Sequence, residues 1–168
     1  MAAPERQIVV FRGLQVLVIV SLGLFGGLVF LGNILDYNAN FQFVKHVLSM
    51  DTVFEGNTQK WRAIENDTLH HACYLLLIVA EGIFTLLCLW GGADLARRLT
   101  DKKPVFAAAK TKAYYGIGVG LLIWLIGFVV VGSEWFGMWQ STVWNGKDTA
   151  MQISFLLISS AILTGIEK

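Results

Sequence analysis

The segment Leu14–Leu35 reads LQVLVIVSLGLFGGLVFLGNIL and contains no charged residue. A helix needs about 20 apolar residues to cross a bilayer, so this segment is long enough to do so. A helix also satisfies its own backbone N–H and C=O groups in hydrocarbon, and the alternation typical of a membrane β-strand is missing here. We therefore predict a membrane-spanning helix over residues 8–35. Its apolar stretch exceeds the roughly 7–15 residues of a secretory signal, so we expect the helix to be retained.

Three further apolar segments follow, at residues 69–90, 113–131 and 150–166. Only one charge, Glu81, lies within them. Together with the first segment they predict an all-α integral membrane four-helix bundle, formed as a single domain by residues 1–168.

The composition of the chain agrees with this prediction. Hydrophobic residues make up 55% of the 168 residues, charged residues make up 15%, and the mean hydropathy is +0.61. A soluble domain carries about 25% charged residues, which argues against a soluble enzyme or a disordered chain. The net charge of +1 and the lack of a long basic stripe argue against a nucleic-acid partner.

The Lys and Arg residues predict the orientation of the chain. The N-terminal segment, the 97–112 loop and the C-terminus together hold nine of the 13 basic residues, and the other two loops hold four. Because cytoplasmic segments are enriched in Lys and Arg, we expect a multi-pass protein of the bacterial inner membrane with both termini in the cytoplasm. The lipid bilayer is therefore an expected partner of this chain.

The loops at residues 36–68 and 132–149 are expected to form a small outer cap. A structureless loop of more than thirty residues is uncommon, so the first should contain its own elements. Residues 41–48 have helical apolar spacing and predict an amphipathic helix at the membrane interface. Residues 57–64 predict a second short helix, and Asp67 or Thr68 is expected to cap the next span.

The second outer loop is rich in tryptophan. Trp135, Trp139 and Trp144 lie within ten residues of one another. They are typical of an aromatic belt at the headgroup level. Alternatively, Trp135 and Trp139 share one helical face and pack against the first loop or a partner subunit.

Glu81 is the most distinctive single residue, because a central acidic residue costs roughly 2.5–3.5 kcal/mol in a span. It should face the bundle. Tyr74, Glu81 and Cys88 recur every seven residues, and Thr85 lies one helical turn after Glu81. These residues therefore form a polar stripe along the predicted helix. The candidate intramembrane site therefore comprises Glu81, Tyr74 and Thr85. Two interpretations stay open: a proton or ion site, or a buried carboxyl hydrogen-bonded to another helix.

The three histidines predict no metal site. His70 and His71 are adjacent and point about 100° apart on a helix, and His46 lies in the first loop. No zinc-binding spacing is present, so we expect neither a metal nor a cofactor, and interpret the histidines as polar caps. A redox or metal protein using these three residues is the third functional hypothesis.

Two pairs of glycines are spaced for close helix packing. Gly23 and Gly27 lie in the first span, and Gly116 and Gly120 lie in the third. Small residues four apart let two helix backbones approach closely, so we expect these faces to pack inside the bundle.

Four motifs in the outer loops resemble a known family. They are NANFQFVKHVLSMDT at 38–52, WRAI at 61–64, EWFGMWQS at 134–141 and WNG at 144–146. The chain resembles a bacterial family described as predicted small integral membrane proteins. The resemblance implies four spans with two longer outer loops, and it implies no activity. It assigns to the family pattern Asn40, Phe41, His46, Met50, Asp51, Trp61, Glu134, Trp135, Trp139 and Trp144.

The leading functional hypothesis is a non-catalytic accessory or assembly subunit of a larger bacterial inner-membrane complex, respiratory or otherwise energy-transducing. The sequence lacks nucleotide-binding, hydrolase and metalloprotease motifs, so we expect no enzymatic activity. Other membrane subunits are the expected partners, and the candidate docking surface comprises Phe41, His46, Trp61, Trp135, Trp139 and Trp144. The alternative is a small transporter or proton-linked channel that uses Glu81.

Overall fold

The computed structural model describes residues 3–167, which form helices and loops without strands. Four helical stretches are long and apolar enough to cross a membrane. They are α1 (Ala3–Leu35), α3 (Asp67–Arg97), the run of α4 (Lys103–Ala109), α5 (Thr111–Leu121) and η2 (Leu122–Trp135), and α6 (Lys147–Gly165). The shorter elements are α2 (Tyr37–Ser49), η1 (Lys60–Arg62) and η3 (Met138–Gln140). The predicted all-α membrane bundle is confirmed.

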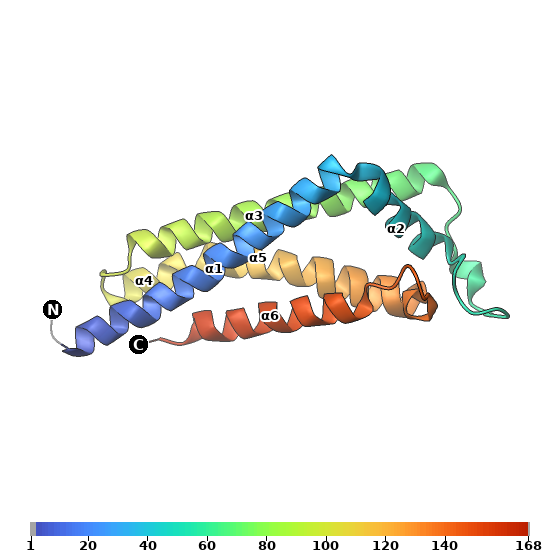
Figure 1. Ribbon diagram of the computed structural model, residues 1–168. Helices are drawn as coiled ribbons and strands as arrows, with labels where there is room; N and C mark the ends of the chain where they lie inside the picture. The colour runs from blue at the N-terminus through green and yellow to red at the C-terminus, as the bar shows by residue number, and fades with distance from the viewer. Residues whose placement is uncertain (1–2, 168) are drawn as a thin grey trace.

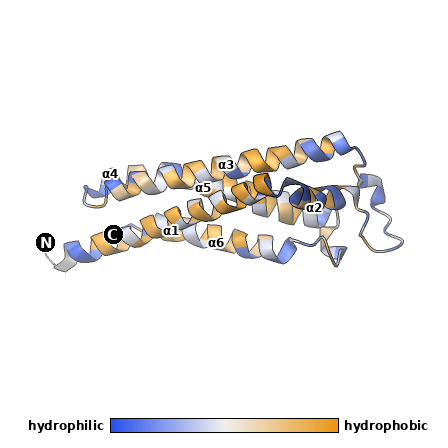
Figure 2. Ribbon diagram, turned by 45° about the horizontal axis from the view of Figure 1, so that its top comes forward, coloured by the Kyte–Doolittle hydropathy of each residue, from blue (hydrophilic) through white to orange (hydrophobic). Residues whose placement is uncertain are grey.

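The long helices lie side by side, and both termini are at the same end of the bundle (Figure 1). We call this the terminal end. The segments 36–66 and 136–146 gather at the opposite end, and we call them the cap. Apolar residues dominate the long helices between the two ends, and hydrophilic residues gather at the ends (Figure 2).

The predicted small-residue faces lie at helix contacts. A Cβ on Gly23 would lie 2.8 Å from Leu89, so α1 and α3 approach closely here. A Cβ on Gly116 would lie 2.6 Å from Cys88 Sγ, which places α5 equally close to α3. These glycines therefore set the distance between the central helices.

The main apolar core fills the part of the bundle nearer the terminal end. Phe84 and Trp124 meet edge to face, with ring centroids 5.2 Å apart, and Phe25 packs on Trp124 at 5.7 Å. Ile19, Leu95 and Leu157 are buried in the same apolar cluster. This packing fills the bundle between Glu81 and the terminal end.

The side chains of Arg12 and Gln15 tie the terminal end together, a role that the sequence did not reveal. Arg12 donates to the main-chain oxygens of Leu99 and Asp101 at 2.9 and 2.7 Å. Gln15 donates to the main-chain oxygens of residues 163, 164 and 166 at the end of α6. Because the last carbonyls of a helix lack intrahelical partners, the Gln15 amide acts as a cap from another helix.

Two local predictions in the first outer loop were wrong, and one was confirmed. The segment 57–64 forms only the single turn η1, and its neighbours are irregular. Asn66, rather than Asp67 or Thr68, caps α3, because its side chain accepts from the Leu69 N–H at 3.1 Å. The amphipathic helix predicted over residues 41–48 is present as α2, and its apolar residues Phe41, Val47 and Leu48 are buried against protein.

The third span also differs from a regular α-helix. Its second half, η2, is π-helical over 14 residues, as in the bond from the Phe136 N–H to the Val131 oxygen at 3.0 Å. The helix ends at Trp135, and Gly137 then adopts a left-handed conformation with φ of 68°. Trp135 and Trp139 therefore do not share one helical face, because the chain turns between them.

Candidate functional site

Glu81 lies near the middle of α3 and is only 2% exposed. The Asn33 amide of α1 donates to Glu81 Oε2 at 2.7 Å, and the Tyr74 hydroxyl donates to the Asn33 main-chain oxygen at 2.9 Å. Thr85 donates to the main-chain oxygen of Glu81 at 2.8 Å and not to its carboxyl group. The predicted stripe thus contributes Glu81 and Tyr74 to one polar cluster, and Asn33 completes it.

This cluster borders a cavity of about 270 Å³ on its cap side, which we call the Glu81 chamber. Its wall is formed by residues of five helices, α1, α2, α3, η2 and α6. Its polar wall residues are Asn33, Asn40, Tyr74, Glu81 and Thr149. Its aromatic wall residues, besides Tyr74, are Phe43, Trp124 and Phe128. The chamber reaches the partly exposed residues Asn40 and Thr149, so it opens toward the cap end.

The charge of the chamber comes from one side chain. Glu81 is the only carboxylate in its wall, and none of the described wall residues is Lys, Arg or His. Oxygen Oε1 of Glu81 accepts no hydrogen bond from residues 3–167. The chamber wall therefore holds a carboxyl group with no basic residue beside it.

A larger apolar groove of about 520 Å³ lies next to the chamber, between α2, α3 and η2. The two spaces share the wall residues Phe43, Val44, Leu77 and Phe128. Leu76 and Leu122 on the other side of the groove are exposed, so it faces the surroundings of the bundle. In a bilayer this face meets the acyl chains.

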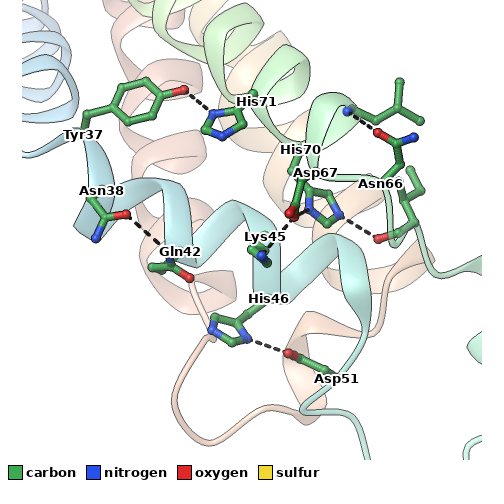
Figure 3. Close-up of polar contacts among 12 residues, drawn as sticks. Tyr37, Asn38, Gln42, Lys45, His46, Asp51, Asn66, Asp67, His70 and His71 are labelled. Atoms are coloured by element: carbon green, nitrogen blue, oxygen red, sulfur yellow. Dashed lines mark hydrogen bonds and ion pairs between the residues drawn. The ribbon is translucent and has the colours of Figure 1, made fainter.

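The three histidines have separate partners (Figure 3). His46 contacts Asp51 Oδ2 at 2.6 Å, His71 hydrogen-bonds Tyr37 at 2.8 Å, and the buried His70 donates to the Ile64 main-chain oxygen at 2.7 Å. Residues 3–167 contain no group of three His, Cys, Asp or Glu side chains that could hold a metal ion. The structure thus does not bring the histidines together, and each fixes a different part of the cap.

The cap carries an exposed aromatic pair. Trp61 is 73% exposed and Trp135 is 48% exposed, and their rings meet edge to face at 6.1 Å. The Arg62 guanidinium lies 4.4 Å from the Trp135 ring centroid and donates to the Trp135 main-chain oxygen at 3.2 Å. Trp139 is also exposed and packs against Phe54.

Three other residues of the predicted docking surface are less available. Phe41 is buried and stacks on His71 with ring centroids 4.0 Å apart, so it is not a surface residue. His46 and Trp144 stack on each other at 4.7 Å and are partly covered. The placement of Phe41 on the docking surface was therefore wrong, because His71 of α3 covers its ring.

The two halves of the cap are joined by polar contacts. Gln140 Oε1 accepts from the Phe54 N–H and from the Asn57 amide, both at 3.0 Å. The Ile64 N–H donates to the Leu48 main-chain oxygen at 2.9 Å. A cavity of about 530 Å³ lies between these segments, with Arg62 and Glu134 among its wall residues. The exposed tryptophans are therefore held on a folded support.

Sequence reasoning missed Asn33 and Arg62. Asn33 is an amide near the end of an uncharged span, which is a signal for a polar contact, but its partner is 48 residues away. Arg62 was counted only as a basic loop residue, although the WRAI motif at 61–64 contains it.

The comparisons with known proteins point to one family. No curated relative and no solved structure matches the chain significantly. The model of the family described as "Predicted small integral membrane protein (DUF2165)" matches residues 11–167, which is nearly the whole chain. That match agrees with the four candidate membrane spans of the fold. The chain belongs to the DUF2165 family of predicted small integral membrane proteins.

Proposed function

We propose that the chain is a non-catalytic accessory or assembly subunit of a larger bacterial inner-membrane complex, respiratory or otherwise energy-transducing. The observation that carries this proposal is the supported aromatic pair of the cap, Trp61 and Trp135, with Arg62 against both rings. Trp and Arg are enriched among the residues that dominate binding energy at protein interfaces. A partner subunit would bury these rings.

Two further features support docking through the cap. The aromatic rings belong to segments joined by Gln140, so little conformational entropy would be lost when a partner binds. The adjacent cavity of about 530 Å³ has both charged and polar wall residues and could accept a side chain or loop of the partner. With the orientation that the basic residues favour, the cap faces the periplasm and the termini face the cytoplasm.

Replacing Trp61 or Trp135 by alanine should weaken the complex by about 30-fold for each ring, and replacing both should weaken it further, because hot-spot residues contribute about 2 kcal/mol or more each. The measurement is extraction of native membranes in mild detergent, with a tagged chain, a native gel and mass spectrometry. The wild type should migrate in a complex of defined stoichiometry, and the double variant should migrate alone.

Trp90→Ala is the matched control, because Trp90 is also exposed, at 55%, but lies near the terminal end of α3. This variant should keep the complex. A wild-type chain that migrates alone, or a complex that survives the double substitution, would contradict docking through the cap.

Transport through the bundle is the second candidate function. It is favoured by the placement of Glu81 in the wall of a chamber that opens at the cap end. The packing of Phe84, Trp124 and Leu157 closes the other half, so transport requires a second conformation. Proton flux into proteoliposomes that is lost in Glu81→Gln would support this function, and equal flux in the variant would exclude it.

A further inference from the structure

We propose that the Glu81 chamber is a binding site for a small hydrophobic organic cation, such as a quaternary ammonium or a protonated tertiary amine. This inference is independent of docking through the cap and holds whether or not the bound cation is transported. It rests on the charge, the walls and the size of the chamber.

The carboxyl group supplies the counter-ion. Glu81 is almost fully buried, Asn33 holds its Oε2 at 2.7 Å, and its Oε1 accepts nothing from residues 3–167. A buried carboxylate is costly without a positive partner, and the wall of the chamber contains no basic residue. A cationic ligand would supply the missing charge.

The aromatic walls favour an organic cation over a hydrated metal ion. Phe43 of α2, Tyr74 of α3, and Trp124 and Phe128 of η2 line the chamber. The rings of Phe43 and Phe128 stack with centroids 6.0 Å apart and form one continuous side. Aromatic faces attract alkylammonium groups, whereas Ca²⁺ binds six to eight oxygen ligands and the chamber has one carboxylate.

The size and neighbours of the chamber narrow the ligand class. Its volume of about 270 Å³ lies near the small end of ligand pockets, which measure roughly 300–1,000 Å³. The adjoining groove is apolar and borders the chamber at Phe43 and Phe128. The groove therefore places an apolar surface that faces the bilayer next to the site. A phospholipid fits less well, because its phosphate would add a second negative charge beside Glu81.

The test compares three probes on the purified full-length chain in uncharged maltoside micelles. They are benzyltrimethylammonium, its uncharged carbon isostere neopentylbenzene, and the anion benzylsulfonate. Isothermal titration calorimetry should show saturable binding of the cation, much weaker binding of the isostere and none of the anion. Equal binding of the cation and the isostere by the wild type would overturn the proposal without any variant.

Glu81→Gln should weaken cation binding roughly 100-fold, as expected when one partner of a buried charge pair is removed, and should leave the isostere unaffected. Glu134→Gln is the control, because Glu134 is exposed and lies outside the chamber wall. Unchanged cation affinity in Glu81→Gln would overturn the assignment. Displacement of the cation by phosphatidylethanolamine would also overturn it, in favour of a lipid headgroup.

Discussion

Replacing Gly116 by leucine should lower the free energy of unfolding by about 3 kcal/mol, the upper part of the range for overpacked cores. A Cβ at this position would lie 2.6 Å from Cys88 Sγ and 3.0 Å from the Cys88 main-chain nitrogen. The backbone cannot yield as a flexible side chain does, so α3 and α5 would have to separate. Chemical unfolding in detergent, followed by circular dichroism, measures the effect.

Gly118→Leu is the matched control for this prediction. Gly118 lies two residues further along α5, and a Cβ there would meet nothing within 4 Å. This substitution should leave stability unchanged or raise it slightly, because leucine is a better helix former than glycine. If both variants lost the same stability, close approach of α3 and α5 would not be the cause.

Replacing Arg12 by methionine should destabilise the terminal end by about 3 kcal/mol, because hydrogen bonds from a charged donor contribute roughly 1.5–3 kcal/mol each. Arg12 is buried, makes two such bonds to the α3–α4 connection, and lies 4.4 Å from the Phe106 ring centroid. Methionine keeps much of the volume and removes the donors. Hydrogen exchange of residues 98–103 should therefore accelerate, together with a lower unfolding midpoint.

Arg6→Met provides the control, since Arg6 is exposed on the same helix. It removes the same charge and should leave both measurements near the wild-type values. Arg12→Lys should recover part of the loss, because a lysine reaches one carbonyl more readily than two. Equal effects of the Arg6 and Arg12 substitutions would show that net charge matters, and not the two hydrogen bonds.

The docking and chamber proposals concern different surfaces and can fail separately. The Trp61 and Trp135 rings lie on the exposed cap, whereas Glu81 lies inside the bundle. A cap variant that loses its partner but still binds the cation would separate the two roles. A Glu81→Gln variant that keeps its partner but no longer binds the cation would also separate the two roles.

Sequence alone determined the membrane architecture, because transfer of a segment into hydrocarbon depends mainly on its own residues. The uncharged run Leu14–Leu35 was sufficient to indicate the first span, and three similar runs indicated the others. The glycine spacings also identified faces of close packing, since four-residue periodicity is local to one helix.

Tertiary structure alone decided which polar groups meet. The bond between Asn33 and Glu81 joins residues 48 positions apart, and the bond between Gln140 and Asn57 joins residues 83 positions apart. Arg12, which looked like an orientation signal, is a buried donor to a loop 87 residues away. The choice of partner depends on how helices are placed and rotated around the bundle, and local periodicity does not encode it.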